Sequence, residues 1–187
     1  MSTLEHSEAE AQAAPATPTT TGHPIGRLGG VIARADPGTR AALARLNPGA
    51  MRPHQVAALC RALITAGLSP ETWHPAHWQR WALVAHGMAL AGHDGTERIG
   101  VQLAAARTSE GRVTKLLVSR GDAFLQIVPR LLRLLASKEV KPNWNDLHKL
   151  IEKNDGKSSV DHAAAEALRL RIAGDYFSAI ARNQKHT

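Results

Sequence analysis

Apolar residues recur along most of the chain at intervals of three and four positions, which is the period of an α-helix. Two segments show this pattern most clearly, one with Trp78, Trp81, Ala82, Ala85 and Met88 and one with Leu125, Val128, Leu132 and Leu135. The aromatic share is only 4%, and extended alternating runs of Val, Ile and Thr, which favour strands, are missing. The pattern therefore predicts an all-α fold.

Capping and turn residues divide this pattern into separate helices. Asp36 and Pro37 form an N-cap followed by a proline at the first helical position, and Asn47-Pro48-Gly49 ends that helix. Pro129 should kink or interrupt the helix that contains it. Further helices are predicted near Pro53–Ala66, Pro75–Leu90, 97–106, 109–119, 122–136, 144–153 and 160–182, with Ser109, Asp122 and Asn143 as start signals.

Composition predicts three parts in the chain. Residues 1–30 are expected to form a disordered tail, because this segment is rich in Ala, Thr, Pro and Glu and has too few bulky apolar residues to offset the entropy of ordering. The glycines and the aspartate within 92–96 mark the seam between the halves. Residues 31–94 should then form an N-terminal helical bundle, and residues 95–187 a basic C-terminal one.

The sequence indicates a cytoplasmic protein. Cys60 is the single cysteine, so the chain cannot form an internal disulfide, and its apolar helical neighbours predict a buried, inert thiol. The first residues include Glu5, Glu8 and Glu10 but neither the basic region nor the apolar region of a signal peptide. No stretch is apolar enough to span a bilayer.

Positive charge is concentrated in the second half of the chain. The formal net charge is +7. Residues 1–97 carry 7 Arg and 7 acidic residues, whereas residues 98–187 carry 16 Lys and Arg against 9 Asp and Glu, so the whole excess lies in the second half. Such an asymmetry suggests that one half docks on a partner while the other meets a polyanion.

Two predicted helices of the second half carry rows of cations. Arg112 and Lys115 lie three positions apart on the face opposite to the apolar residues of their helix, and in the next helix Arg130 and Arg133 continue a row that begins at Gln126. Residues at the helix ends extend these rows, so the candidate nucleic-acid-binding residues of this half are Arg107, Arg112, Lys115, Arg120, Arg130 and Arg133.

The rows are best interpreted as a track for phosphate groups. Ordinary solvated helix faces are the alternative, but a face that only serves solubility usually mixes both signs of charge, and no acid is interleaved here. Arginine also binds phosphate with a planar fork of donors. Stacking platforms for bases are scarce, because the spacing of Trp78, Trp81, Trp144, Tyr176 and Phe124 favours structural positions. Binding should then be nearly independent of base sequence.

Catalytic and metal sites are not indicated. His74 and His77 form a His-x-x-His pair, but Pro75 interrupts it, no HExxH motif follows, and surface or helix-capping histidines explain the pair better. Paired-carboxylate motifs, a GxxxxGK[ST] loop and a Gly-x-Ser-x-Gly elbow are all missing. We therefore expect no catalytic residue, no metal and no cofactor.

Five segments in order along the chain resemble the CasB family, the small subunit of the type I-E CRISPR Cascade complex. They are RAALARLNPG at 40–49, RIGVQLA at 98–104, SEGRVTKLLVSRGD at 109–122, LLRLLASKEVKPNWNDLHKLI at 131–151 and LRIAGDYF at 170–177. The resemblance covers roughly residues 36–180. It implies an all-helical protein of two small bundles.

The resemblance also implies partners and site residues. A protein of this family is present as a pair along Cascade, contacts the subunits that coat the guide RNA, and helps to hold the displaced single-stranded non-target DNA of the R-loop. Arg112, Arg120 and Arg130 match basic positions of the family's second-half helices, and Arg45 lies where the first-half pattern carries arginine. Two other hypotheses are a helical adaptor whose basic faces meet acidic proteins and, more weakly, a metal-dependent hydrolase that uses His74 and His77.

Overall fold

A computed structural model describes residues 22–154 and 158–185 of the chain. These residues form nine α-helices and one short 3-10 helix, with no strand among them, so the predicted all-α fold is confirmed. The helices are α1 (Pro24–Arg34), α2 (Pro37–Ala44), α3 (Pro53–Thr65), η1 (Pro70–Thr72), α4 (Pro75–Ala91), α5 (Ile99–Ala105), α6 (Glu110–Val118), α7 (Gly121–Ser137), α8 (Trp144–Lys153) and α9 (Ser159–Lys185). None of the described helices is both long and apolar enough to cross a lipid bilayer.

Proline and a capping side chain start several of these helices. Pro37 follows Asp36, whose Oδ1 accepts a hydrogen bond from the backbone N–H of Thr39 at 2.9 Å, as the sequence predicts. His74 caps α4 in the same way, because its Nδ1 accepts from the N–H of Ala76 at 3.3 Å. The capping interpretation of His74 is therefore confirmed. Each of these contacts satisfies a backbone donor that the first helical turn leaves without a partner.

Helix α1 corrects the predicted extent of the tail. The segment from 24 to 30 is helical rather than disordered, because Ile25, Leu28 and Ile32 follow one another at helical spacing and are almost completely buried. The glycines of this segment, Gly26, Gly29 and Gly30, dilute the apolar pattern and hide it in the sequence. Residues 1–21, which form the rest of the predicted tail, lie outside the described residues.

Two further details, the start of α7 and the burial of Cys60, differ from the sequence predictions. Arg120 rather than Asp122 is the N-cap of α7, so Asp122 lies within the first turn, where its charge suits the helix dipole. Helix α7 continues through Pro129 without the interruption that was one of two predicted outcomes there, and the kink stays a prediction. Cys60 is half-buried rather than buried.

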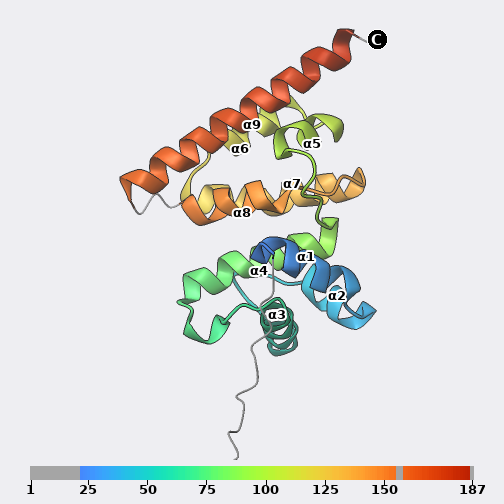
Figure 1. Cartoon of the computed structure of the whole chain (residues 1–187), viewed down its shortest axis with the longest axis vertical. Coiled ribbons are helices and arrows are strands. Elements are labelled where there is room, and N and C mark those ends of the chain that lie inside the picture. The colour runs from blue at the N-terminus through green and yellow to red at the C-terminus, as the bar shows by residue number, and fades with distance from the viewer. Residues whose placement is uncertain (1–21, 155–157, 186–187) are drawn as a thin grey trace, which may run out of the picture.

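Helix α4 lies at the centre of the molecule and joins its two halves. Its residues from 80 to 88 are all buried, and the helix contacts α1 and α2 on one side and α7 and α8 on the other (Figure 1). Trp144 of α8 is completely buried, and its Nε1 donates a hydrogen bond to the carbonyl of Gly92 at 2.9 Å. The two halves therefore share a packed contact, and their division into two separate bundles near residue 94 stays a prediction.

Helix α9 covers the second half. It packs along α5 and α8 and also contacts α6, and Figure 1 shows it as the long helix at one edge of the molecule. The crossing with α5 is close because Gly100 has no side chain, and a Cβ atom there would lie 2.5 Å from the carbonyl oxygen of Ile172. The hydroxyl of Tyr176 donates to the carbonyl of Thr108 at 2.6 Å and fixes the same contact.

Candidate nucleic-acid interface

Helices α6 and α7 present their cations to solvent, as their sequence pattern predicts. Val113 and Leu116 of α6 are buried, whereas Arg112 and Lys115 are exposed. In α7 the buried positions include Val128, Leu132 and Leu135, while Gln126, Arg130 and Arg133 are exposed. The amphipathic character predicted for both helices is confirmed.

A groove between α6 and α7 brings three of the predicted cations together. Arg112 and Lys115 from α6 and Arg130 from α7 line a cavity of about 390 Å³, which we call the α6–α7 groove. Its remaining lining is apolar and consists of Ile127, Leu131 and Leu134. Within residues 22–154 and 158–185, none of the three cations makes an ion pair or a side-chain hydrogen bond. Three positive charges are thus available to a ligand in the groove.

The composition of the groove suits an anion. A concave surface of one charge sign with apolar, low-dielectric walls concentrates the electrostatic potential more than a flat surface does. The guanidinium groups of Arg112 and Arg130 offer forks of donors that match phosphate oxygens, and the ammonium group of Lys115 adds a point charge. The groove contains no aromatic side chain. Its chemistry therefore favours phosphate groups rather than stacked bases.

Arg120 lies in the turn between α6 and α7, does not line this groove, and already has partners. Its Nη2 donates to both carboxylate oxygens of Glu166, at 2.7 and 2.8 Å, and its Nη1 donates to the carbonyls of Leu117 and Ser119 at 2.6 and 3.0 Å. A phosphate at Arg120 must compete with Glu166. Arg120 therefore has a structural role through Glu166, and its assignment as a nucleic-acid contact stays a prediction.

Glu166 holds a second, buried guanidinium that sequence reasoning missed. Arg169 of α9 is 4% exposed, and its Nη1 donates to Glu166 at 3.0 Å. Its Nη2 donates to the carbonyl of Ser119 at 3.2 Å and to the side chain of Asn154 at 3.1 Å. Burial lowers the pKa of Arg169 from its ordinary value. Because one carboxylate serves two guanidinium groups, the set of Arg120, Arg169 and Glu166 keeps a net positive charge.

Arg133 of α7 is exposed to solvent. Burial lowers the pKa of His86 in α4, and the positive charge of Arg133 adds to this effect. Nδ1 of His86 is 3.3 Å from the carbonyl oxygen of Leu43 near the end of α2. Arg133 does not line the α6–α7 groove.

A second basic surface lies where α2 ends and α3 begins. Arg45, Arg52 and His54 line a cavity of about 730 Å³ there. Gln55 holds the two arginine backbones together, because its Nε2 donates to the carbonyl of Arg45 at 2.9 Å and its Oε1 accepts from the N–H of Arg52 at 3.0 Å. Arg45 was predicted, but Arg52 and His54 were not. The sequence signal that could have identified them is that Arg52 and His54 flank Pro53, the first residue of α3.

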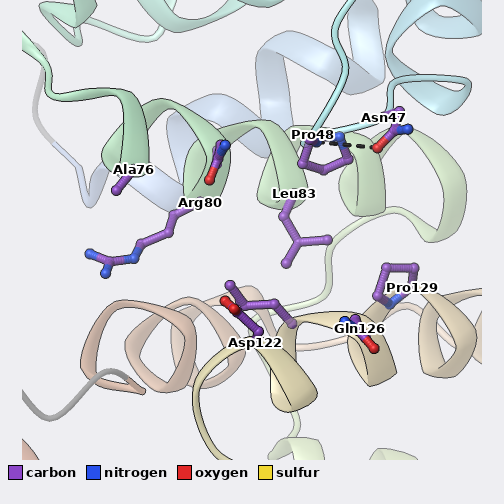
Figure 2. Close-up of a pocket in the computed structure, with 11 residues that line it drawn as sticks. Asn47, Pro48, Ala76, Arg80, Leu83, Asp122, Gln126 and Pro129 are labelled. Atoms are coloured by element: carbon purple, nitrogen blue, oxygen red, sulfur yellow. Dashed lines mark hydrogen bonds between the residues drawn. The ribbon is translucent and has the colours of Figure 1, made fainter.

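The predicted residue Arg107 is not part of either basic surface, and neither is Gln126, which begins the polar row of α7. Arg107 follows α5 with a positive φ of 51°, is exposed, and does not line the α6–α7 groove. Gln126 lines a cleft of about 450 Å³ between α4 and α7, which also contains Arg80, Asp122 and Pro129 (Figure 2). Arg80 lies 3.6 Å from Glu152, and the cleft contains charges of both signs. This cleft is a weaker site for a polyanion than the α6–α7 groove.

Aromatic and histidine side chains have structural contacts. Phe124 and Trp144 are completely buried, and Trp81 donates its Nε1–H to Nε2 of His77 at 3.0 Å. These contacts agree with the structural positions predicted for the aromatic residues. Ring stacking joins Trp73, which sequence reasoning did not consider, to Trp81 at 5.6 Å. In the part of the chain that the structure describes, no group of three or more His, Cys, Asp or Glu is placed to hold a metal ion.

Fold and groove together define a small all-helical protein whose surface cations converge between two helices. The sequence pattern of the family described as CRISPR-associated protein Cse2 matches residues 39–177, a range that contains all seven predicted cations. The chain therefore belongs to the Cse2 family, which confirms the resemblance to CasB, and the family provides non-catalytic subunits of the CRISPR Cascade complex. No curated protein and no solved structure matches the chain.

Proposed function

We propose that this chain is the small subunit of a type I-E Cascade complex and that it binds the sugar-phosphate backbone of nucleic acid without sequence preference. Its main ligand is the displaced non-target DNA strand of the R-loop. The observation that supports this proposal is the convergence of Arg112, Lys115 and Arg130 in the α6–α7 groove, with no carboxylate partner among the described residues.

Because R-loop formation is nearly balanced in free energy, a few binding contacts can shift its equilibrium. A guide heteroduplex is about as stable as the DNA duplex that it replaces, so the exchange is nearly balanced. A few phosphate contacts to the displaced strand then shift the equilibrium toward the open state. Contacts of this kind carry no base information, in agreement with a groove that lacks aromatic side chains.

The uneven distribution of charge supports different proposed roles for the two halves of the chain. Residues 98–187 carry the whole net charge of +7, and they include α6 and α7. The first half is neutral overall and is proposed to contact the other Cascade subunits and the guide RNA, with Arg45 as an additional backbone contact. The proposed site of action is the cytoplasm, where guide RNA and Cascade assemble.

The proposal is tested by R-loop lifetime in reconstituted Cascade. The variant Arg112→Ala/Lys115→Ala/Arg130→Ala is expected to shorten the lifetime, with a smaller effect at higher salt because salt already weakens the phosphate contacts of the wild type, while subunit stoichiometry and guide RNA content stay unchanged. The matched control Arg61→Ala/Arg182→Ala/Lys185→Ala removes the same charge from exposed positions of α3 and α9 and should leave the lifetime unchanged.

Two results would contradict the proposal. If the groove variant and the wild type give equal R-loop lifetimes, the groove does not bind the displaced strand. Loss of the variant subunit from an otherwise intact complex favours the adaptor hypothesis instead, in which the basic faces contact acidic partner proteins and not nucleic acid.

A further inference from the structure

Three histidine side chains accept hydrogen bonds where α1, α4 and α8 meet. Nδ1 of His23 accepts from a backbone N–H in the first turn of α1 at 3.4 Å. Nδ1 of His93 accepts from the backbone N–H of Trp144, the first residue of α8, at 3.3 Å. On α4, Nε2 of His77 accepts from the indole Nε1–H of Trp81 at 3.0 Å. We call His23, His77 and His93 the acceptor histidines.

The three helices at these bonds pack against one another and join the two halves of the chain. Helix α1 contacts α4 and α8, and α4 contacts α8, near the middle of the molecule in Figure 1. Nδ1 of His77 lies 3.7 Å from a carboxylate oxygen of Glu152 on α8. His93 follows α4 in the chain and bonds to the buried Trp144 of α8. A change of charge at the acceptor histidines therefore acts on the contact between the halves.

Each of these bonds requires an imidazole nitrogen without a proton, because a protonated histidine has two donors and no acceptor. At His23 and His93, a proton would leave a backbone N–H at a helix start without its partner and would place a positive charge where the helix dipole disfavours cations. At His77, a proton would remove the acceptor of the indole N–H of the buried Trp81. The side chains of Ser, Thr, Asp and Asn accept at helix starts without titrating near neutral pH, so histidine makes this junction sensitive to protons.

The charges around His77 do not offset the effect of its burial. The carboxylate of Glu152 also serves Arg80 and His148, each of which has a nitrogen 3.6 Å from one of its oxygens. Burial lowers the pKa of His77, although the charge of Glu152 acts in the opposite direction. The neutral form of His77 is therefore favoured at neutral pH.

Positive charges act on His23 from two helices. Burial lowers the pKa of His23, and the charges of His148, Lys149 and Arg27 lower it further. Arg27 belongs to α1, whereas His148 and Lys149 belong to α8. Protonated His23 would be repelled by groups on both helices, which favours separation of α1 from α8.

Groups of both signs act on His93. Burial lowers the pKa of His93, while the carbonyl of Pro142 and the charge of Asp94 act in the opposite direction without offsetting burial. His93 also lines a cavity of about 440 Å³ whose described lining includes Arg40 and Lys141 but no carboxylate. A proton on His93 would thus add a third positive charge beside this cavity.

We propose that the junction of α1, α4 and α8 is a proton-sensitive contact, which is closed while the acceptor histidines are neutral and loosens when they take up protons in mild acid. Burial alone would raise the pKa of Glu152, but its neighbours His148, His77 and Arg80 lower the pKa overall, so the carboxylate stays ionised in mild acid. The pKa values of the acceptor histidines in the folded chain lie below the value of about 6.5 in the unfolded chain. The junction is therefore closed at neutral pH and weakens as the pH falls below about 6.5.

The indole N–H signals of the full chain, labelled at the tryptophan nitrogens, test the bond at His77. They are followed by NMR spectroscopy from about pH 7.5 to about pH 5.5, the range in which imidazoles titrate. The Trp81 signal is expected to shift in one titration step as its acceptor is lost. In His77→Gln, whose side-chain oxygen can accept in the place of Nε2, this step should be absent. A Trp81 signal that moves equally in both proteins contradicts the loss of the acceptor.

Hydrogen exchange of backbone amides tests the junction as a whole. Protection of the α1 amides, corrected for the intrinsic exchange rate, should fall about tenfold or more between about pH 7.5 and about pH 5.5, because helix starts lose their acceptors. The variant His23→Asn/His77→Gln/His93→Asn keeps an acceptor oxygen at each position but cannot titrate there, so its α1 amides should keep their protection. The control His162→Asn removes an exposed histidine of α9 and should behave as the wild type does.

Two results overturn the proposal. An equal loss of α1 protection in the wild type and the triple variant assigns the loss to other groups. Equal protection of the α1 amides and of the α9 amides that face α5, at about pH 5.5, shows unfolding of the whole chain and not opening of a local contact. Circular dichroism checks folding at neutral pH, and if the triple variant is unfolded, each single variant should still reduce the loss. No nucleic acid is present in these measurements, so their outcome is independent of the proposed function.

Discussion

Gly87 of α4 lies directly against the indole ring of Trp144 of α8, and a Cβ atom at position 87 would overlap with that ring. Leu132 of α7 approaches the same point. Three helices from both halves of the chain therefore meet at a residue without a side chain. The packing between the halves depends on this glycine.

Gly87→Ala is accordingly expected to destabilise the protein. Overpacking of a core contact typically costs about 1–3 kcal/mol, which exceeds the roughly 1 kcal/mol that alanine gains over glycine in a helix. Thermal or urea unfolding followed by circular dichroism measures the change. Gly111→Ala in α6 is the matched control, because a Cβ atom there meets nothing within 4 Å, and stability should stay equal or increase. A Gly87→Ala variant as stable as this control would show that the α4–α8 contact is not tight.

Removal of the groove cations should change the salt dependence of strand binding. Each phosphate contact to a single strand contributes about −0.7 to the slope of log K against log salt, so losing three contacts should make the slope shallower by roughly 2. The isolated chain and the Arg112→Ala/Lys115→Ala/Arg130→Ala variant are compared by fluorescence anisotropy with single-stranded DNA of mixed sequence. An unchanged slope with reduced affinity would indicate a conformational effect rather than lost phosphate contacts.

Glu166→Gln should separate structural from electrostatic effects at Arg120. Loss of the carboxylate frees the Arg120 side chain but leaves the buried Arg169 without its charged partner, so stability should fall by about 1–3 kcal/mol while strand affinity rises. Unfolding and anisotropy measurements on the same sample test both changes. Asp161→Asn is the control, since it removes the charge of the partly exposed ion pair with Lys153 at 2.8 Å and should cost less than about 1 kcal/mol. Reduced strand affinity in Glu166→Gln would argue against Arg120 as a phosphate ligand.

Stability should decrease in mild acid because of His86. Burial lowers the pKa of His86 in the folded state below the value of about 6.5 expected in the unfolded chain. The unfolded state therefore binds the proton more readily, so the stabilising contribution is complete above about pH 6.5 and is lost as the pH falls toward the folded-state pKa. The free energy of unfolding of the wild type should drop more steeply than that of His86→Gln. Equal slopes for the two proteins would assign the loss to other groups, and His162→Gln at an exposed position serves as the control.

Local sequence signals predicted the helices well because their causes are local. Asp36 and Pro37 start α2 through contacts within four residues, and Asn143 caps α8 by accepting from the N–H of Asn145 at 2.9 Å. Helix α1 was missed for a local reason as well, since glycine adjacent to Leu28 lowers helix propensity and only packing against α3, α4 and α8 stabilises the segment.

The candidate site was only partly predictable because its assembly is not local. Helical periodicity correctly placed Arg112 and Arg130 on exposed faces, but their convergence depends on how α6 packs against α7. The pairing of Arg120 with Glu166 joins residues 46 positions apart, and no spacing rule within one helix indicates it. Long-range packing therefore decides which of the predicted cations stay available to a ligand.

The turn between α6 and α7 is tied to the rest of the protein through its backbone. Asn154 donates to the carbonyl of Gly121 at 2.9 Å, and Arg169 donates to the carbonyl of Ser119 at 3.2 Å. The turn that joins the two groove helices is thus preorganised, so a strand bound as proposed would lose little affinity to ordering of the main chain in this turn. On the protein side, immobilising the three flexible groove side chains would cost about 0.5–1.5 kcal/mol each.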